Sequence, residues 1–375
     1  MSALRDHVRS GGPVSVSSVL VVGTGLIGTS VALALREHGV TVHLSDRDPR
    51  AVRLARELGA GSEWPPGGAP EPVDLAVIAV PPPYVADELR RLQRAGTARW
   101  YTDVASVKAL PLRRAAELGC DLTAFAAGHP LAGSERSGPA AARADLFLGR
   151  PWAYCPTEET SADAVEAVLG LIKLCGGEPV RVSAADHDEA VALISHAPHV
   201  AAAAVAARLA DAPGIALGLA GQGVRDVTRI AASDPGLWTG ILAGNALPVA
   251  DVLQAVADDL AAAAAALRDT ASAGDEAMAR VVDLLKRGVA GRERIPGKHG
   301  GPARTYTVVQ VVIGDRPGEL ARLFQVAEES GVNVEDVRIE HAPGLPLGMA
   351  ELSVQPEAAA ALADALRAHG WDVPS

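Results

Sequence analysis

The sequence contains few aromatic residues, few cysteines and too few basic residues to balance its acids. Aromatic residues make up 3% of the 375 residues, so alanine, valine and leucine must fill the cores of the two or three domains that this length predicts. The three cysteines, Cys120, Cys155 and Cys175, form no C-x-x-C pair, which indicates a reducing compartment. The formal net charge of −11 argues against nucleic acid and anionic membranes as partners.

Long apolar runs are missing as well. No uncharged apolar stretch reaches the roughly 18 residues that a transmembrane helix needs, and residues 1–13 contain charges and glycines but no apolar signal core. The sequence therefore predicts a cytoplasmic protein without a membrane span.

The strongest local pattern is a strand, a glycine triplet and a helix near the N-terminus. An apolar run over 19–22 predicts a buried strand, and Gly23, Gly25 and Gly28 follow it with the spacing G-x-G-x-x-G. In this fingerprint the first glycine makes a tight turn, the second lets backbone approach a pyrophosphate, and the third lets the helix lie close to the strand. The expected helix over 29–38 would point its N-terminal N–H groups at the phosphates.

A second expected strand, 40–45, ends at Asp46, where a ribose-binding carboxylate belongs. A carboxylate accepts a hydrogen bond from a ribose 2′-hydroxyl and repels a 2′-phosphate, so the sequence favours NAD over NADP. Arg47 keeps NADP open, because its guanidinium could turn toward a phosphate. The other expected cofactor contacts are Leu26 and Ile27 between the glycines, Val80 and Pro81 at the end of a later strand, and Ser106.

Strands and helices alternate up to residue 183. Further strands are expected at 74–80, 100–104, 122–127, 151–155 and 179–182. This alternation predicts an α/β fold with a parallel, doubly wound sheet of the Rossmann type. From residue 184 strand signals stop, and alanine-rich helices predict an all-α second domain whose small-residue faces suit a homodimer. A monomer on gel filtration would contradict the dimer.

The end of the chain is predicted to form a separate small domain. Strands at 306–313, 332–341, 347–354 and 371–373 and the helices between them predict a βαββαβ, ferredoxin-like α+β unit. Before it, 286–304 is basic and glycine-rich; we favour a solvated linker, the alternative being a loop that brings cations to an anionic site. The expected domains are 1–183 (NAD-binding), 184–290 (helical, dimer-forming), 291–304 (linker) and 305–375 (small α+β).

Polar residues mark the ends of two expected strands. His129 follows the strand 122–127, and Ser106 and Lys108 follow the strand 100–104. In a Rossmann sheet the carboxyl ends of the strands meet beside the cofactor. A histidine at that edge suits general-base chemistry near neutral pH, so these residues are candidates for the reacting centre.

A second group of polar residues lies in the helical part. His196 and His199 are three residues apart on one helix face, but no third ligand lies at metal spacing, and we expect no metal site. Arg225 and Arg229 lie four residues apart, and the Arg229 guanidinium could hold a carboxylate bidentately.

Five motifs in this order resemble the prephenate/arogenate dehydrogenase family of tyrosine biosynthesis: G-x-G-L-I-G, D-V-A-S-V-K, G-H-P-L-A-G-S-E, S-H-x-P-H and R-D-V-T-R-I-A-x-S-D-P-x-x-W. The resemblance runs from about residue 16 to 290 and implies NAD-dependent oxidative decarboxylation of prephenate to 4-hydroxyphenylpyruvate. It implies that His129 is the base for the substrate's ring hydroxyl and that Ser106 hydrogen-bonds this hydroxyl and His129. The substrate contacts that it implies are Arg229 on a carboxylate, His199 and His196 along the site, and Arg225, Lys108, Glu135 and Trp238 as further pocket members.

Residues 305–375 resemble an ACT domain, the module by which many amino-acid biosynthetic enzymes sense their end product. Its ligand-loop signature is D-R-P-G-E-L, formed here by Asp315, Arg316, Pro317, Gly318, Glu319 and Leu320. The resemblance implies feedback regulation by an amino acid, with tyrosine expected and phenylalanine as the alternative effector. A structural ACT domain that binds no effector also stays open.

Rival functions remain at this point. Arogenate, which has an amino group in place of the side-chain ketone, or a 4-amino analogue of prephenate would keep the same mechanism. A β-hydroxyacid dehydrogenase would need a lysine in the helical domain, and none lies between Lys173 and Lys286. A non-enzymatic amino-acid sensor that binds NAD is disfavoured, because Ser106, His129 and Arg229 are all in place.

Overall fold

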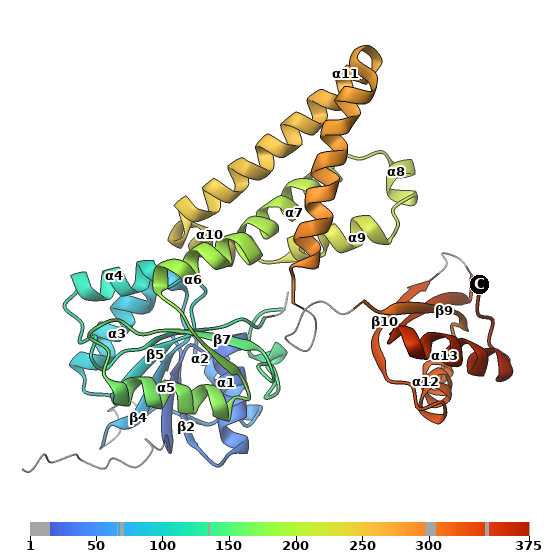
Figure 1. Ribbon diagram of the computed structural model, residues 1–375. Helices are drawn as coiled ribbons and strands as arrows, with labels where there is room; N and C mark the ends of the chain where they lie inside the picture. The colour runs from blue at the N-terminus through green and yellow to red at the C-terminus, as the bar shows by residue number, and fades with distance from the viewer. Residues whose placement is uncertain are drawn as a thin grey trace, which may run out of the picture. The chain divides into compact units, whose positions relative to one another are not determined.

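The computed structural model describes residues 16–65, 67, 71–133, 136–296, 305–341 and 345–374. The chain divides into two compact units, one up to residue 257 and one from residue 258, and each is described by itself (Figure 1). Glu135 and residues 297–304 of the expected linker lie outside the described residues.

The first unit begins with the expected Rossmann sheet. The strands β1 (Ser18–Val22), β2 (Thr41–Ser45), β3 (Ser62–Glu63), β4 (Val73–Ile78) and β5 (Ala98–Asp103) are all parallel, in the order β3-β2-β1-β4-β5. The helices beside them are α1 (Leu26–Glu37), α2 (Pro49–Glu57), α3 (Val85–Arg94) and α4 (Ala109–Glu117), with the short η1 (Pro82–Tyr84) before α3. Figure 1 shows helices on both faces of this sheet, which confirms the doubly wound architecture.

The period of two along β1 explains why both faces are covered. Val19 and Val21 pack in one core cluster with Leu35 of α1, whereas Leu20 packs in a second cluster with Leu89 of α3. Successive side chains of a strand point to opposite faces, so a continuous apolar strand requires an apolar layer on each side.

A second, three-stranded sheet corrects the prediction of one parallel sheet. It contains β6 (Ala127–Pro130), β7 (Pro151–Cys155) and β8 (Glu178–Arg181), with β6 antiparallel to β7. Parallel neighbours need a crossover, usually through a helix; the connection from β6 to β7 has only the 3₁₀ turn η2 (Pro139–Ala141) among its described residues, whereas α5 (Ala162–Leu174) joins the parallel pair β7 and β8. The strand expected at 122–127 was therefore placed too early, and His129 lies inside β6.

The helical part of the first unit starts with α6 (Ala184–Val191), the π-helical η3 (Ala192–His196) and α7 (Ala197–Ala207). The α-helical hydrogen bonding is interrupted within this stretch. Pro198 has no N–H to donate to the carbonyl of residue 194, and Ala197 instead donates to the Ala192 oxygen. Next come α8 (Gly214–Gly218), α9 (Gln222–Thr228), η4 (Arg229–Ala232), α10 (Pro235–Gly244) and the start of α11 (Ala246–Glu293).

The stretch Ala184–Ala207 is long and apolar enough, by length and composition, to cross a membrane, and so is α10 taken together with 246–269 across a 100° bend. Core helices of folded proteins pass the same test. Asp188 on α6 and His196 on η3 are buried and hydrogen-bonded to other elements of this unit. Ala184–Ala207 is therefore tied into the fold of this unit through these two residues, although only 33% of its apolar window is buried.

Helix α11 consists of two arms. Gly274 between them has φ +46°, a left-handed conformation that favours glycine. Within the second unit, Arg287 on the second arm forms ion pairs with Asp259 on the first arm, at 2.8 Å, and with Asp283, at 3.0 Å. The two arms lie side by side in Figure 1, so the chain makes a helical hairpin here.

The second unit ends in an antiparallel sheet covered by two helices. Its elements are β9 (Thr307–Gly314), α12 (Glu319–Glu329), β10 (Val334–His341), β11 (Leu347–Val354) and α13 (Pro356–Ala368), with strand order β10-β11-β9. The fourth strand expected at 371–373 is reduced to a single bridge between Val312 and Asp372. Val311 of β9 packs with Leu323 of α12 and Leu362 of α13, so this part has a core of its own.

Candidate active site

The glycine-rich turn between β1 and α1 has the shape of a phosphate cradle. Gly23 has φ +101°, and a Cβ atom there would lie 2.3 Å from the Ala79 carbonyl oxygen. A Cβ atom on Gly28 would lie 1.9 Å from the Gly23 oxygen, whereas at Gly25 nothing lies within 4 Å. Glycine is thus required at 23 and 28 by the packing of the turn itself. At Gly25 the space is open, as the approach of a phosphate requires.

The side chain of Asp46 holds this turn in place. Its Oδ2 accepts hydrogen bonds from the backbone N–H and the hydroxyl of Thr24, at 2.6 and 3.1 Å, and its Oδ1 accepts from the Asp48 N–H at 2.9 Å. Arg47 is exposed. On the other side of β1, Val80 and Pro81 follow β4, which pairs with β1. The sheet order reverses at this point, where ligands bind in open α/β sheets.

His129 lies on β6, with its ring against that of His187 on α6. The distance from His129 Nδ1 to His187 Nε2 is 2.9 Å, and the ring centroids are 5.1 Å apart. Burial is the main reason why the pKa of His129 lies well below 6.5, and His187, Lys108 and His196 lower it further. The imidazole is therefore neutral at physiological pH and can act as a hydrogen-bond acceptor or base.

Lys108 is not accessible, as a residue that binds the substrate directly would be. It is fully buried, and its ammonium group bonds to the Asp103 carboxylate and, at 2.6 Å, to the Gly128 oxygen. Asp103 Oδ1 in turn accepts from the Gly128 N–H at 3.1 Å. Both backbone groups of the residue before His129 are thus held by this ion pair, which fixes the position of β6.

Ser106 follows β5 and is partly exposed. Its expected hydrogen bond with His129 is not formed in the described part of the chain, where the ring of His129 bonds to His187. The role of His187 was missed in the sequence. The only signal was its position beside Asp188 at the boundary where strand signals stop, and this does not reveal that α6 packs against α4 and β7.

His196 and His199 meet Trp238 of α10, as expected for residues of one site. Trp238 stacks on His199, with centroids 3.6 Å apart and planes 8° apart, and it meets His196 edge-on at 6.0 Å. His196 is buried, and this burial lowers its pKa to about 4. Its Nδ1 lies 3.2 Å from the side-chain amide nitrogen of Asn245, a residue that the sequence did not single out.

Arg225 and Arg229 lie on the helical side of this unit. Both are exposed, on α9 and η4 respectively, and these two elements pack against α7, which carries His199. Helix α10 with Trp238 packs against η1, immediately after Pro81. The helical part thus borders the expected cofactor edge of the sheet within the same unit.

Two further expectations concern metals and an effector. No group of three or more potential metal ligands occurs in the described ranges. The expected effector loop, Asp315 to Leu320, connects β9 to the first turn of α12. Gly318 has φ +88°, and the Asp315 N–H donates to the Pro346 oxygen at 3.0 Å.

Comparison with known proteins identifies the family. Residues 31–181 match the family model described as the nucleotide-binding domain of prephenate dehydrogenase, and residues 183–286 match its dimerization domain. The chain is 42% identical over 364 residues to "Probable prephenate dehydrogenase NovF" of Streptomyces niveus, covering 96% of this chain and 99% of that protein.

Solved structures agree with this assignment. A structure of prephenate dehydrogenase from Aquifex aeolicus in complex with hydroxyphenyl propionate and NAD+ is 25% identical, with a TM-score of 0.64 over 75% of this chain and 99% of that one. Arogenate dehydrogenase from Synechocystis is 27% identical, with a TM-score of 0.60 over 74% and 99%. The family expected from the five sequence motifs is thus confirmed: this chain belongs to the prephenate dehydrogenase family, with a nucleotide-binding domain followed by a dimerization domain.

Proposed function

We propose that the protein is a cytoplasmic, NAD-dependent prephenate dehydrogenase that converts prephenate to 4-hydroxyphenylpyruvate and carbon dioxide in tyrosine biosynthesis. The observation that carries this proposal is the neutral His129 near the carboxyl edge of the sheet, with one ring nitrogen engaged by His187. Such a histidine is suited to take the proton of a ring hydroxyl. The family assignment supports the same reaction.

NAD fits the residues at the glycine-rich turn. Gly25 leaves room for the pyrophosphate, the N-terminus of α1 faces that space, and Asp46 stands where a ribose 2′-hydroxyl would donate a hydrogen bond. A 2′-phosphate would be repelled by this carboxylate, so NADP is the weaker candidate. The NAD+ complex of the Aquifex aeolicus relative supports the choice.

The chemistry needs alignment and one proton carrier. When bound, NAD supplies the acceptor for the hydride that leaves the carbinol carbon of prephenate. His129 takes the hydroxyl proton as the carbonyl forms, and it returns this proton to the ring oxygen after the carbon–carboxylate bond has broken and carbon dioxide has left. Because aromatisation favours the products, the protein's main tasks are orientation and proton transfer.

The remaining site residues are proposed to bind the substrate. Ser106 donates to the ring hydroxyl, Arg229 holds a carboxylate, and the stacked rings of Trp238 and His199 form an apolar wall for the substrate ring. His196, Arg225 and Glu135 are further proposed members of the pocket. Lys108 and Asp103 keep β6 in position through their bonds to the backbone of Gly128.

The test is NADH formation by the full-length protein with prephenate, arogenate and the 4-amino analogue in parallel. We expect turnover with prephenate. Turnover with arogenate alone would mean that the mechanism holds but the substrate is arogenate, in line with the likeness to the Synechocystis enzyme. Turnover with the amino analogue alone would likewise change only the substrate. No turnover with any of the three would contradict the proposal and favour an NAD-binding sensor.

We further propose that residues 305–375 form an ACT domain through which tyrosine inhibits the enzyme, with the domain limits expected from the sequence. The strand order β10-β11-β9, extended by the bridge at Asp372, agrees with the ferredoxin-like pattern. The assay repeated with tyrosine is expected to show inhibition. Phenylalanine serves as the competing effector, and equal rates with and without both amino acids would leave the domain a structural role only.

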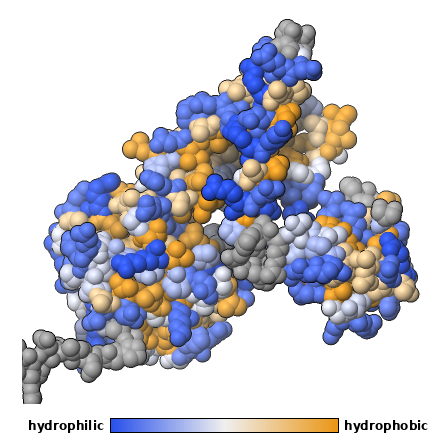
Figure 2. All heavy atoms as spheres, viewed as in Figure 1, coloured by the Kyte–Doolittle hydropathy of each residue, from blue (hydrophilic) through white to orange (hydrophobic). Residues whose placement is uncertain are grey.

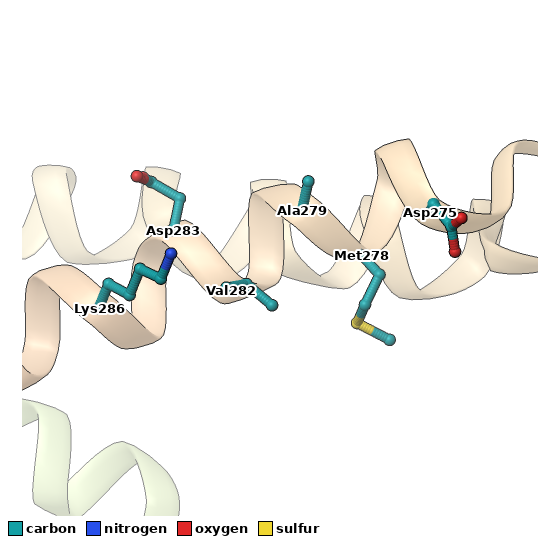
Figure 3. A pocket seen from close by; sticks show the side chains of 6 residues that line it. All are labelled: Asp275, Met278, Ala279, Val282, Asp283 and Lys286. Carbon is teal, nitrogen blue, oxygen red and sulfur yellow. The ribbon is translucent and has the colours of Figure 1, made fainter.

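A homodimer is the third part of this proposal. In the first unit, large apolar side chains of the matched dimerization domain are exposed, and orange spheres gather over α8 in Figure 2. In the second unit, the second arm of α11 carries a groove lined by Met278, Val282 and four neighbours, namely Asp275, Ala279, Asp283 and Lys286 (Figure 3). Buried against a second chain, such faces would contribute roughly 1.5–3 kcal/mol per large apolar side chain.

A further inference from the structure

Asp188 and His187, adjacent on α6, are linked to His129 by an unbroken chain of hydrogen bonds. Asp188 Oδ1 lies 2.8 Å from His187 Nδ1, and His187 Nε2 lies 2.9 Å from His129 Nδ1. Both Asp188 and His187 are 3% exposed, so water does not compete for these bonds.

We propose that Asp188 and His187 are positioning residues that fix the tautomer of His129, so that its Nε2 carries the lone pair used as the base. This inference rests on the proposed function for its catalytic meaning. The tautomer itself depends only on the structure and can be measured without any substrate.

The donor and acceptor at each step of this hydrogen-bond series follow from the number of protons that each group carries. An ionised carboxylate only accepts hydrogen bonds, so the nitrogen that faces Asp188 must be the N–H of His187, at Nδ1. In its neutral form an imidazole has one donor and one acceptor, so in neutral His187 the Nε2 atom is the acceptor. It follows that His129 donates through Nδ1–H, and that its Nε2 is left unprotonated.

The Asp188 carboxylate also accepts hydrogen bonds from two backbone N–H groups. Its Oδ1 also accepts from the Lys108 N–H at 2.8 Å, and its Oδ2 accepts from the Ala109 N–H at 2.9 Å. These N–H groups belong to the N-terminus of α4, whose dipole favours negative charge. In addition, the Asp188 backbone oxygen accepts from the Asn245 side chain at 2.7 Å. The carboxylate thus ties α6 to α4 and is the first acceptor in the hydrogen-bond series that leads to His129.

The reverse arrangement shows why this orientation matters. If His187 offered a donor instead of an acceptor, His129 would accept at Nδ1 and carry its proton on Nε2. The free nitrogen of His129 could then donate to the ring hydroxyl but could not take its proton. Fixing a catalytic imidazole in the correct tautomer is also the task of the carboxylate in serine-protease triads.

The test compares two substitutions at one position in the full-length protein. In His187→Gln the amide oxygen can still accept from His129 and the amide N–H can still donate to Asp188, whereas His187→Leu can do neither. We expect His187→Leu to lower kcat about 10- to 100-fold with little change in KM for prephenate or NAD. His187→Gln is expected to keep most of the activity.

The second readout is the protonation pattern of His129 by ¹⁵N NMR of histidine-labelled protein, with the His129→Asn variant to assign the signal. We expect the Nδ1–H tautomer in the wild type and in His187→Gln, and loss of this preference in His187→Leu and in Asp188→Asn. An Nε2–H tautomer in the wild type would overturn the proposal, whether or not any substrate is turned over.

Two kinetic outcomes would also overturn it: wild-type kcat in His187→Leu, or equal losses in His187→Leu and His187→Gln. If His187→Leu does not fold, the wild-type tautomer and the Asp188→Asn tautomer still decide. If every substrate is inert but His129 is the Nδ1–H tautomer, the hydrogen-bonded chain stands and the proposed function fails. The two proposals are therefore separable.

Discussion

The two sides of the candidate site differ in how complete they are within one chain. On the sheet side, Asp103 and Lys108 are fully buried, and each has its hydrogen-bond partners in the same unit. On the helical side, Ile215 and Leu219 are 76% and 80% exposed, and Arg229 is exposed as well. The polar groups beside His129 thus have their partners within the chain, whereas these residues of the helical side are exposed to solvent.

The difference follows from what each side packs against. β6 lies between the Rossmann sheet and α6, so its polar neighbours must be paired in order to be buried at all. Helices α8 and α9 lie within the matched dimerization domain, and their apolar residues have no such cover in the described chain. The sheet side therefore depends on internal polar pairs, whereas we expect the helical side to depend on a second chain.

The largest effect is expected from breaking the buried ion pair of the sheet side. In Lys108→Met the Asp103 carboxylate keeps its backbone donors but loses its cation, which should lower the free energy of unfolding by about 3–5 kcal/mol. Denaturant unfolding measures this loss. The matched control is Arg113→Ala, which removes an exposed i,i+4 pair with Glu117 on one face of α4 and should cost at most about 0.5 kcal/mol. Similar losses of unfolding free energy in both variants would contradict the view that the buried ion pair stabilises the fold more than the exposed one.

The next effect concerns His129, the proposed proton carrier. His129→Asn should lower kcat by about 10²-fold or more, since general-base catalysis contributes at least this much, while NAD binding measured by titration stays unchanged. An unchanged rate would refute the role of His129.

The wild-type pH profile sharpens the same point. Burial holds the pKa of His129 well below 6.5, so the neutral, active form is present at pH 7 and persists as the pH falls to 6.5. We expect kcat/KM for prephenate to stay level over this range and to fall only at lower pH, when His129 becomes protonated. A profile that already halves near pH 6.5 would mean that the burial of His129 does not set its pKa.

How far the sequence could predict this site depends on the range of the interactions. The glycine triplet and Asp46 were identifiable because one βαβ unit brings them together, and the structure shows why Gly23 and Gly28 allow no Cβ atom. The residue types at the sheet edge, His129 and Ser106, were identifiable from the rule that ligands bind at the carboxyl ends of strands.

The rest required the packing between distant elements. His187 contacts His129 over a sequence separation of 58 residues, and Asp188 contacts Lys108 over 80. No local sequence pattern predicts contacts between residues so far apart in the chain. The antiparallel β6 was missed because a strand's direction is set by its partner, not by its own sequence. The burial of Lys108 was missed for a similar reason, because a lysine at a strand end normally keeps its charge in water.

The smallest effect on the single chain is expected on the helical side. Replacing Ile215 and Leu219 together by glutamate removes two side chains that are already exposed, so the free energy of unfolding of the chain itself should change by no more than about 0.5 kcal/mol. The same change places two charges on a face that we expect to be buried in the dimer, so gel filtration should shift from dimer to monomer. The control is Leu58→Glu at the end of α2, which is also an exposed apolar residue but lies in the nucleotide-binding domain and should leave the dimer intact. A double variant that remains dimeric with wild-type kcat would mean that α8 is not part of the interface, and that the helical side of the site is completed without it.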